Sequence, residues 1–488
     1  DRIAADRGNA EPFDEARRRI ARRARGQAAP ARAIDAIRTG IDVSFDAGLA
    51  EERATSAELK ASPQSKAMRH VFFAEREAAK IPGLAAGSPP PVHRAAVVGA
   101  GTMGGGIAMC FANAGIPVTL LDSAPAALER GLGTIRRNYE ATAARGGLTA
   151  AEVERRMGLI RPGDALADVA GADMIIEAVF ENTGIKQAVF AELDRHADAD
   201  AVLGTNTSTL DIDAIAGATQ RPGSVIGLHF FSPANVMRLL EVVRGSGTAD
   251  ATIARGMALG RQIAKVPVLA GNCDGFIGNR MLRSRGREAE RLVLEGALPH
   301  EVDRVLYDFG LPMGPYAMGD LAGLDIGWRI RQERGLKSPV ADRLCALGRF
   351  GQKTGAGWYR YEPGSRTPVP DPAVEAIVAE VRRDLGINPR AIGDEEIQRR
   401  LLFPMVDEGA RILEERVAIR PGDIDVVWVY GYGWPIYRGG PMHWADSIGL
   451  RTVLDGLKAM RRDGDPAPAA LLERLAAEGR GLRDFTTA

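Results

Sequence analysis

The stretch that decides the fold of this chain is Arg94-Ala95-Ala96-Val97-Val98-Gly99-Ala100-Gly101-Thr102-Met103-Gly104. A short apolar run leads into three glycines spaced as GxGxxG, and a helical pattern follows over residues 107–114. A second apolar run, 117–121, then ends at Asp122. Strand, glycine turn, helix, strand and acid in this order predict the first βαβ unit of a Rossmann-type dinucleotide-binding domain.

Each residue type in this turn has a physical task. Gly99 permits the tight turn, Gly101 lets the backbone approach a pyrophosphate, and Gly104 lets the helix pack closely on the strand. The first N–H groups of the helix favour bound phosphates. Asp122 can accept hydrogen bonds from the adenosine ribose, and its charge would repel a 2′-phosphate, so NAD is favoured over NADP. The alternative is a glycine-rich structural turn with an incidental aspartate.

Short apolar runs alternate with helical patterns from residue 94 to about residue 272, and helical periodicity alone follows. This alternation predicts a parallel sheet with crossover helices, so we place the dinucleotide-binding domain at residues 89–272. The runs expected to form strands include Ala95–Val98, Val118–Leu121, Met174–Val179, Ala201–Leu203, Val225–Leu228 and Val266–Leu269.

The helical part contains an internal repeat in which Gly-Pro, Asp and Gly-Leu recur at the same spacing. The positions are Gly314-Pro315, Asp320 and Gly323-Leu324 in one copy, and Gly440-Pro441, Asp446 and Gly449-Leu450 in the other. We predict two related all-α repeats, at residues 273–390 and 391–488. They should pack on each other, because one alone would bury little apolar surface.

The composition limits the classes of function. The 488 residues carry 63 basic and 63 acidic side chains, so no net charge attracts nucleic acid or a membrane surface. The basic run Arg17-Arg18-Arg19 is better explained as a solvated helix face. Three scattered cysteines, Cys110, Cys273 and Cys345, favour a reduced intracellular protein without a disulfide framework or a metal site. No apolar run reaches the roughly 18 residues of a membrane span.

A second informative stretch runs from Val225 to Pro233. It places His229, one of six histidines, at the end of an apolar strand, and Glu241 follows within the apolar run 239–243. Imidazole titrates near neutral pH and can take a hydroxyl proton, while a carboxylate can fix its tautomer and stabilise the imidazolium. Pairing with His229 would offset the cost of burying Glu241. The alternative is a core histidine bonded to the backbone.

Four other polar residues lie near the ends of apolar runs and are candidates for the same crevice. Glu181 and Lys186 follow the run 174–179, and Ser208 follows the run 201–203. Asn279 opens the helical region. Each has a simpler alternative: a solvated Glu–Lys pair, a helix N-cap at Ser208 and a cap at Asn279.

Taken together, these motifs resemble L-3-hydroxyacyl-CoA dehydrogenases. The resemblance is carried by Gly99–Gly104, Asp122, Asn206-Thr207-Ser208, His229-Phe230-Phe231-Ser232-Pro233, Glu241 and Gly275–Arg280. Three further stretches, Gly351–Tyr359, Gly431–Pro435 and Arg438–Pro441, resemble the multifunctional β-oxidation enzymes of the peroxisomal bifunctional type and the bacterial fatty acid oxidation complex. The helical domain of these enzymes is duplicated, and the internal repeat fits this independently.

In these multifunctional enzymes an enoyl-CoA hydratase/isomerase domain precedes the dehydrogenase. Residues 1–88 are helical in pattern and end in a linker rich in proline and glycine. Residues 34–82 resemble the tail and linker helix of the hydratase domain, whose core with two catalytic glutamates is not visible in this sequence. The resemblance therefore implies a piece of a larger enzyme that performs only the oxidation step.

The resemblance implies oxidation of an (S)-3-hydroxyacyl-CoA by NAD to the 3-ketoacyl-CoA in fatty acid β-oxidation. His229 would take the hydroxyl proton, Glu241 would orient His229, and Ser208 and Asn279 would bind the substrate. The residues implied to bind NAD are Gly99, Gly101, Thr102, Met103, Gly104, Asp122, Glu181, Lys186, Ser208 and Ser232. One departure concerns Asn138 and Arg145, which stand where single-domain members carry a serine and a lysine that contact CoA.

Other functions require different residues. A non-catalytic NAD-binding protein with a structural or sensing role could dispense with the base and its acid. A β-hydroxyacid dehydrogenase with a catalytic lysine would share the glycine turn without needing His229-Phe230-Phe231.

The expected partners are an acyl-CoA thioester and a thiolase, with the chain acting as a monomer or within a larger β-oxidation complex. Its mostly arginine basic residues hint at a GC-rich bacterial genome. The C-terminus lacks Ser-Lys-Leu, the signal for peroxisomal import. This observation and the arginine-rich composition favour a bacterial cytoplasmic location over a peroxisomal one.

Overall fold

The computed structural model describes residues 7–84 and 89–485 and divides the chain into two compact units. The first, called here the helical unit, comprises the residues up to His70, Met281–Glu408 and Gly433–Gly481. The second, called here the sheet unit, comprises Val71–Arg280, Gly409–Tyr432 and the residues from Leu482 onward. Residues 85–88 of the predicted linker and residues 486–488, on which the import-signal prediction rests, lie outside the described residues.

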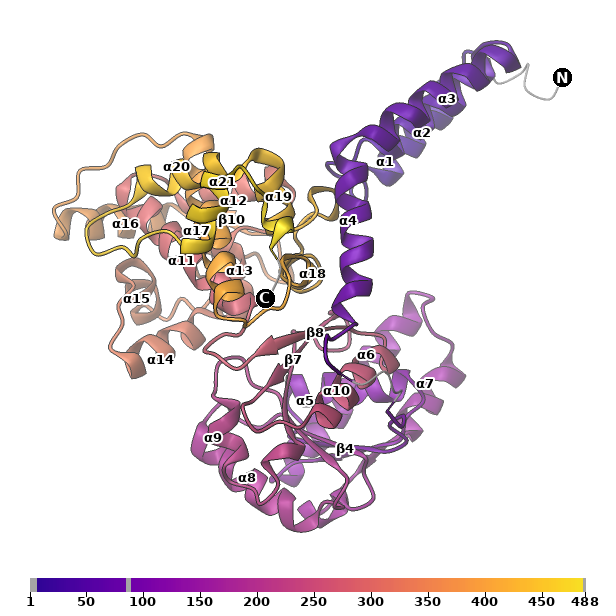
Figure 1. Ribbon diagram of the computed structural model, residues 1–488, viewed down its shortest axis with the longest axis vertical. Helices are drawn as coiled ribbons and strands as arrows, with labels where there is room; N and C mark the ends of the chain where they lie inside the picture. The colour runs from indigo at the N-terminus through magenta and orange to yellow at the C-terminus, as the bar shows by residue number, and fades with distance from the viewer. Residues whose placement is uncertain (1–6, 85–88, 486–488) are drawn as a thin grey trace. The chain divides into compact units, whose positions relative to one another are not determined.

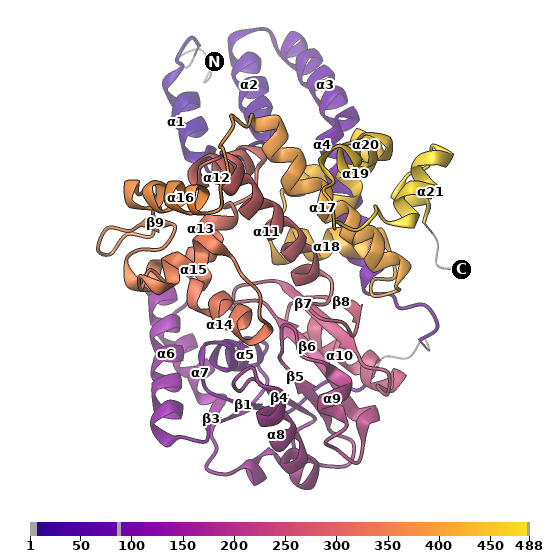
Figure 2. The ribbon, with the colours of Figure 1, turned by 90° about the vertical axis from the view of Figure 1, so that its left-hand side faces the viewer.

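The sheet unit is built on one eight-stranded sheet with the order β3-β2-β1-β4-β5-β6-β7-β8 (Figure 2). The strands are β1 (Ala95–Val98), β2 (Val118–Leu121), β3 (Ile160–Pro162), β4 (Met174–Glu177), β5 (Val202–Thr205), β6 (Val225–Phe230), β7 (Leu239–Arg244) and β8 (Val266–Gly271). From β3 to β6 along this order, every pair of neighbouring strands is parallel, as the alternating pattern predicts. The complete burial of β1, β4, β5 and β6 explains why these strands appear in the sequence as apolar runs.

The sheet differs from an all-parallel one at β6 and β7, which pair antiparallel. Only the segment 231–238 connects these two strands, and it is too short for the crossover that a parallel pair requires. Strand β8 then runs parallel to β7. The sequence predicts the apolar run of β7 but not the direction of this strand.

Helices pack against strands in both halves of the sheet. Helix α5 (Thr102–Asn113) packs against β1 and β2, and α10 (Asp250–Gln262) packs against β6, β7 and β8. The other helices of this unit are α6 (Pro125–Ala144), α7 (Ala150–Gly158), α8 (Thr183–His196), α9 (Ile212–Ala216) and α18 (Pro421–Gly431). Helix α18 contributes to this unit from far along the chain, because it packs against β7 and β8.

The helical unit begins with α1 (Glu11–Ile20), α2 (Ala29–Asp42) and α3 (Phe45–Ala61), which pack in sequence order (Figure 1). Helix α4 (Pro63–Ala78) runs across the boundary between the two units. The remaining helices are α11 (Gly278–Glu295), α12 (Pro299–Phe309), α13 (Pro315–Ala322), α14 (Leu324–Arg334), α15 (Pro339–Ala346), α16 (Pro372–Asp384), α17 (Asp394–Glu414), α19 (Pro441–Ile448), α20 (Leu450–Met460) and α21 (Ala470–Glu478). A short antiparallel pair, β9 (Tyr359–Arg360) and β10 (Val369–Pro370), accompanies them.

The internal repeat recurs in the structure element by element. Helices α13 and α14 in the first copy correspond to α19 and α20 in the second. The glycine that separates each pair has a positive φ, 100° at Gly323 and 89° at Gly449. An L side chain would be strained at these angles, so both copies use glycine at the same corner. Among the described residues, no helix has both the length and the apolar character that crossing a bilayer requires.

Candidate active site

The glycine turn between β1 and α5 has the shape of a phosphate cradle. Gly99 has a φ of 105°, and a Cβ on Gly104 would lie 1.7 Å from the Gly99 carbonyl oxygen, so larger residues would disrupt the turn. A Cβ on Gly101 would meet no atom within 4 Å, which leaves its outer face open to a ligand. No side chain caps the start of α5, so its first N–H groups are available to an anion. These features fit a dinucleotide pyrophosphate.

Asp122 follows β2 and is bonded to the same turn. Its Oδ2 accepts a hydrogen bond from Ala100 N at 2.9 Å, and its Oδ1 accepts one from Ala124 N at 3.1 Å. Each carboxylate oxygen can accept a further bond, so Asp122 can hold the turn and still accept ribose hydroxyls. Asp122 is half-buried, and its bond to Ala100 N holds its carboxylate beside the turn.

His229 and Glu241 lie directly opposite each other on the antiparallel strands β6 and β7. The Nδ1 of His229 is 2.6 Å from the Oε2 of Glu241, and both side chains are buried. A carboxylate has no proton to donate, so Nδ1 carries the proton of this bond and the neutral ring keeps a lone pair on Nε2. The predicted pairing is therefore present, and it fixes the tautomer that a general base requires.

The second oxygen of Glu241 is bonded to the start of α11. Its Oε1 accepts hydrogen bonds from Ile277 N at 3.2 Å and Gly278 N at 3.0 Å. These N–H groups belong to the first turn of a long helix, where a negative charge is stabilised. Glu241 thus has three hydrogen bonds that offset its complete burial.

Aromatic rings surround the imidazole and lead to Asn279. The ring of His229 lies 4.4 Å from that of Phe231 and 5.6 Å from that of Phe276. Phe231 makes an edge contact with Tyr432, whose hydroxyl donates to the Oδ1 of Asn279 at 2.7 Å. Asn279 is half-buried, and this bond orients its amide so that the two N–H donors are presented on the other side.

Lys186 lies on α8 and is completely buried. Its partner is Glu177, the last residue of β4, which the sequence analysis did not include among the site residues. Its ammonium donates to Glu177 Oε1 at 2.7 Å, to Glu177 Oε2 at 3.0 Å and to the carbonyl of Asn206 at 3.1 Å. These bonds use the three N–H donors of lysine. Burial raises the pKa of Glu177, while Lys186 and Thr205 lower it.

Glu181 and Asn206 complete a network around the turn that carries Ser208. The Oε1 of Glu181 accepts from the hydroxyl of Thr207 at 2.7 Å and from Ser208 N at 2.8 Å. Asn206 accepts from Phe230 N at 3.0 Å, which ties this turn to the strand of His229. The hydroxyl of Ser208 is exposed and has no protein partner within the described ranges. It is therefore available to a substrate or a cofactor.

The other predicted positions vary in their surroundings. Thr102 is exposed and Met103 packs against the apolar core of the sheet unit, both in the first turn of α5. Ser232 is exposed, beyond the end of β6. Asn138 lies on α6 with its amide 3.9 Å from the sulfur of Met109, and Arg145 is exposed at the end of that helix.

Sequence reasoning missed Glu177 and Tyr432. Glu177 ends an apolar strand, and a carboxylate at that position signals a buried partner. Tyr432 belongs to the stretch Gly431–Pro435 that carries the family resemblance, but it lies 153 residues from Asn279. Only tertiary packing brings these two residues together.

Comparisons with known proteins agree with this geometry. Residues 94–273 match the family model "3-hydroxyacyl-CoA dehydrogenase, NAD binding domain", and residues 275–361 and 397–484 match "3-hydroxyacyl-CoA dehydrogenase, C-terminal domain". The peroxisomal bifunctional enzyme of Cavia porcellus is 41% identical over 495 residues, which span 96% of this chain and 68% of that protein. The human enzyme of the same name is 40% identical over 507 residues, with the same coverage.

Solved structures give the same result. The 3-hydroxybutyryl-CoA dehydrogenase of Escherichia coli K12 has a TM-score of 0.70 and 28% identity, and the match covers 80% of this chain and 99% of that one. The dehydrogenase part of multifunctional enzyme 1 from C. elegans has a TM-score of 0.63 and 30% identity, covering 83% and 96%. The chain therefore belongs to the 3-hydroxyacyl-CoA dehydrogenase family, and it is an NAD-dependent oxidoreductase.

Proposed function

We propose that the chain oxidises (S)-3-hydroxyacyl-CoA thioesters to 3-ketoacyl-CoA thioesters, with NAD as the oxidant. The observation that carries this proposal is the buried His229–Glu241 pair, which leaves Nε2 of His229 as a base. The pair lies in the same unit as the glycine turn. The family's acyl-CoA substrate class supports the choice of alcohol.

In this proposal the cofactor is held by the glycine turn, the free N–H groups of α5 and the carboxylate of Asp122. When bound, NAD supplies the hydride acceptor for the oxidation. Met103, Thr102 and Ser232 are proposed as further contacts. Lys186 acts on this site indirectly, because its three donors hold Glu177 and Asn206.

The protein's own chemistry is proton transfer. His229 accepts the proton of the substrate hydroxyl at Nε2, and Glu241 stabilises the resulting imidazolium through Nδ1. Glu241 keeps its own orientation because two backbone N–H groups hold its other oxygen. Ser208 and Asn279 bind the substrate through a free hydroxyl and free amide N–H donors.

The proposal extends to the whole protein. Residues 1–88 would be the helical tail and linker of an enoyl-CoA hydratase domain, 89–272 the NAD-binding domain, and 273–390 and 391–488 the two helical repeats. The chain would act in the bacterial cytoplasm as the oxidation part of a multifunctional β-oxidation enzyme, with a thiolase receiving its product. Similarity over 96% of the chain to a relative named a bifunctional enzyme supports the proposal of a multifunctional parent protein.

The test is a direct assay of the full chain with NAD and (S)-3-hydroxyacyl-CoA substrates of several acyl lengths, including (S)-3-hydroxybutyryl-CoA, followed by the rise in NADH absorbance. His229→Gln should reduce kcat by roughly 100-fold or more, because the base is lost. His196→Gln changes an exposed histidine at the end of α8 and serves as the matched control. If the folded protein oxidises no acyl length, the proposal fails and the non-catalytic alternative gains support. A near-normal rate in His229→Gln would rule out this histidine as the base.

A further inference from the structure

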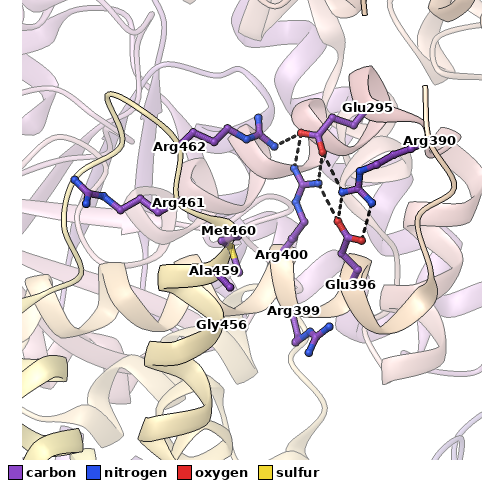
Figure 3. A pocket seen from close by; sticks show the side chains of 10 residues that line it. All are labelled: Glu295, Arg390, Glu396, Arg399, Arg400, Gly456, Ala459, Met460, Arg461 and Arg462. Carbon is purple, nitrogen blue, oxygen red and sulfur yellow. Dashed lines mark hydrogen bonds and ion pairs between the residues drawn. The ribbon is translucent and has the colours of Figure 1, made fainter. Parts of the chain in front are cut away.

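The charged pocket of the helical unit is a structural ion-pair cluster (Figure 3). It has a volume of about 460 Å³ and lies where α11, α17 and the end of α20 meet. Glu295 accepts two hydrogen bonds there from the buried Arg400, at 2.7 and 3.0 Å. Arg462 points toward the same glutamate, whereas Arg399 and Arg461 point away from it (Figure 3). These charges therefore do not converge on one point.

A different arrangement exists at the carboxyl end of β5, where Asn206 is held by three hydrogen bonds. Its backbone N–H donates to the carbonyl of Glu177 at 2.8 Å, and its carbonyl accepts from the ammonium of Lys186 at 3.1 Å. Its side-chain Oδ1 accepts from Phe230 N at 3.0 Å. A backbone N–H can bond only to the oxygen of the amide, so this contact fixes which way the side chain is turned. The amide nitrogen therefore has a defined position.

The Nδ2 of Asn206 is the part of this residue that the protein leaves free. It has no hydrogen-bond partner within residues 7–84 and 89–485, and it is not enclosed, since the residue is only half-buried. Both of its N–H groups can therefore donate to a ligand outside the end of β5. In an α/β sheet, ligands bind in the crevice at these strand ends.

The strand order indicates which part of a dinucleotide reaches this amide. Asp122 follows β2 and the glycine turn follows β1, so the adenosine ribose belongs over β2 and the pyrophosphate over β1. Strands β4 and β5 lie on the other side of β1 from β2. A dinucleotide that extends across these strand ends brings its nicotinamide ring to β4 and β5.

Few donors remain for the nicotinamide at the ends of β4 and β5. The three N–H groups of Lys186 are used within the protein, and the hydroxyl of Thr207 donates to Glu181 at 2.7 Å. Of Lys186 and the side chains of residues 206–208, only Asn206 and Ser208 keep a donor without a protein partner in the described part of the chain. The Ser208 hydroxyl rotates, whereas the Asn206 amide is fixed, so Asn206 is the better group for holding a ring at one angle.

We propose that Asn206 binds the cofactor, with Nδ2 donating a hydrogen bond to the carbonyl oxygen of the nicotinamide carboxamide. The carboxamide is the polar substituent of this ring, and a bond to it holds the ring against rotation. The same asparagine side chain is bonded to Phe230, the residue after His229, so it sets the ring and the base in relation to each other. This inference rests on the proposed function in taking NAD as the cofactor.

Isothermal titration calorimetry of the full chain, without acyl-CoA, compares NAD with thionicotinamide adenine dinucleotide, in which sulfur replaces the carboxamide oxygen. Sulfur is a weak hydrogen-bond acceptor, so we expect the wild-type protein to bind NAD about threefold to tenfold more tightly, the effect of one hydrogen bond. In Asn206→Asp this difference in affinity should disappear, because the aspartate keeps an acceptor for Phe230 N and lacks the N–H donor. The added charge acts on both dinucleotides alike and cancels in the ratio of their dissociation constants.

Asn182→Asp is the matched control. Asn182 is an exposed asparagine at the start of α8 whose Oδ1 also accepts a backbone N–H, that of Ile185, so the change adds the same charge without removing the proposed bond. It should keep the wild-type ratio. Equal affinity of the wild-type protein for the two dinucleotides, or an unchanged ratio in Asn206→Asp, would overturn the proposal. Loss of the difference in Ser208→Ala alone would also overturn it, by assigning the bond to Ser208. Failure to bind NAD at all would contradict the proposed function as well, so the two failures are distinguishable.

Discussion

Glu177 and Lys186 form an ion pair in which neither side chain is exposed, with 2.7 Å between Oε1 and Nζ. The pair joins the end of β4 to the turn that carries Ser208, because the same ammonium donates to the carbonyl of Asn206. Glu177 also accepts from the hydroxyl of Thr205 at 2.7 Å and from Val179 N at 2.6 Å. A charge pair this deep stabilises the protein only while both partners are present.

Lys186→Met should therefore destabilise the protein by about 3–5 kcal/mol, because it leaves the Glu177 carboxylate buried without its cation. The double change Glu177→Gln with Lys186→Met should recover part of this loss, since no charge is then stranded. Urea denaturation measures the free energy of unfolding of the single and the double variant. Lys80→Met breaks a solvent-exposed pair with Glu77 and should leave the midpoint unchanged. A double variant no more stable than Lys186→Met would contradict this account.

Glu241→Gln should lower kcat by roughly 10²–10⁴-fold with little change in the KM for NAD. A glutamine can keep the backbone bonds to Ile277 and Gly278 through its oxygen, but it then presents an N–H to His229 Nδ1. The imidazole must switch tautomer and lose its lone pair at Nε2. Steady-state kinetics over a range of pH would test this. Loss of NAD binding with unchanged kcat would argue instead for a purely structural glutamate.

Tyr432→Phe should lower kcat/KM for the acyl-CoA substrate by about threefold to tenfold, the effect of one hydrogen bond. The change removes the donor that orients the amide of Asn279 and keeps the ring beside Phe231. Tyr430→Phe is the matched control, because that hydroxyl bonds to Glu75 on α4. Equal effects from the two changes would mean that Asn279 does not depend on Tyr432.

Asp122→Asn should reduce the preference for NAD over NADP, expressed as the ratio of kcat/KM values, by about tenfold. The amide retains an acceptor for Ala100 N but removes the negative charge that would face a 2′-phosphate. Kinetics with both cofactors give this ratio. An unchanged ratio would place the source of discrimination elsewhere in the turn.

Asp303 in the helical unit provides a test of pH-dependent stability. Burial raises its pKa to about 6, although Tyr316 N, Tyr359 and Ala317 N all donate to it. A folded pKa above the unfolded value means that its contribution is present at low pH and lost as pH rises from about 4 to about 6. Relative to Asp303→Asn, the unfolding free energy should fall by about 2 kcal/mol between about pH 4.5 and about pH 7.5. Parallel pH dependence in the two proteins would contradict the raised pKa.

The NAD-binding half of the fold was largely predictable because its signals are local. The strands around Gly99 and Asp122 are short apolar runs, and the glycines mark a backbone shape that other residues cannot adopt. The pairing of His229 with Glu241 was also predictable, since a carboxylate in an apolar run requires a partner. The duplicated helical corners at Gly323 and Gly449 were visible as a repeat for the same conformational reason.

Other features depend on contacts that the sequence does not encode locally. The pairing of β7 with β6 places Glu241 opposite His229, and this register is a contact between two strands that only the folded sheet shows. The alternative of Lys186 as a solvated surface residue is wrong, because packing buries its side chain against Glu177. Tyr432 reaches Asn279 across 153 residues.

The sequence by itself determined the dinucleotide turn, the histidine and glutamate proposed for catalysis and the repeated helical corners, because backbone conformation and apolar periodicity are properties of neighbouring residues. The tertiary structure alone decided the polar contacts that the sequence did not indicate, such as Lys186 with Glu177 and Tyr432 with Asn279. These contacts form because a buried charge or amide requires a hydrogen-bonding partner, and folding brings that partner from a distant part of the chain.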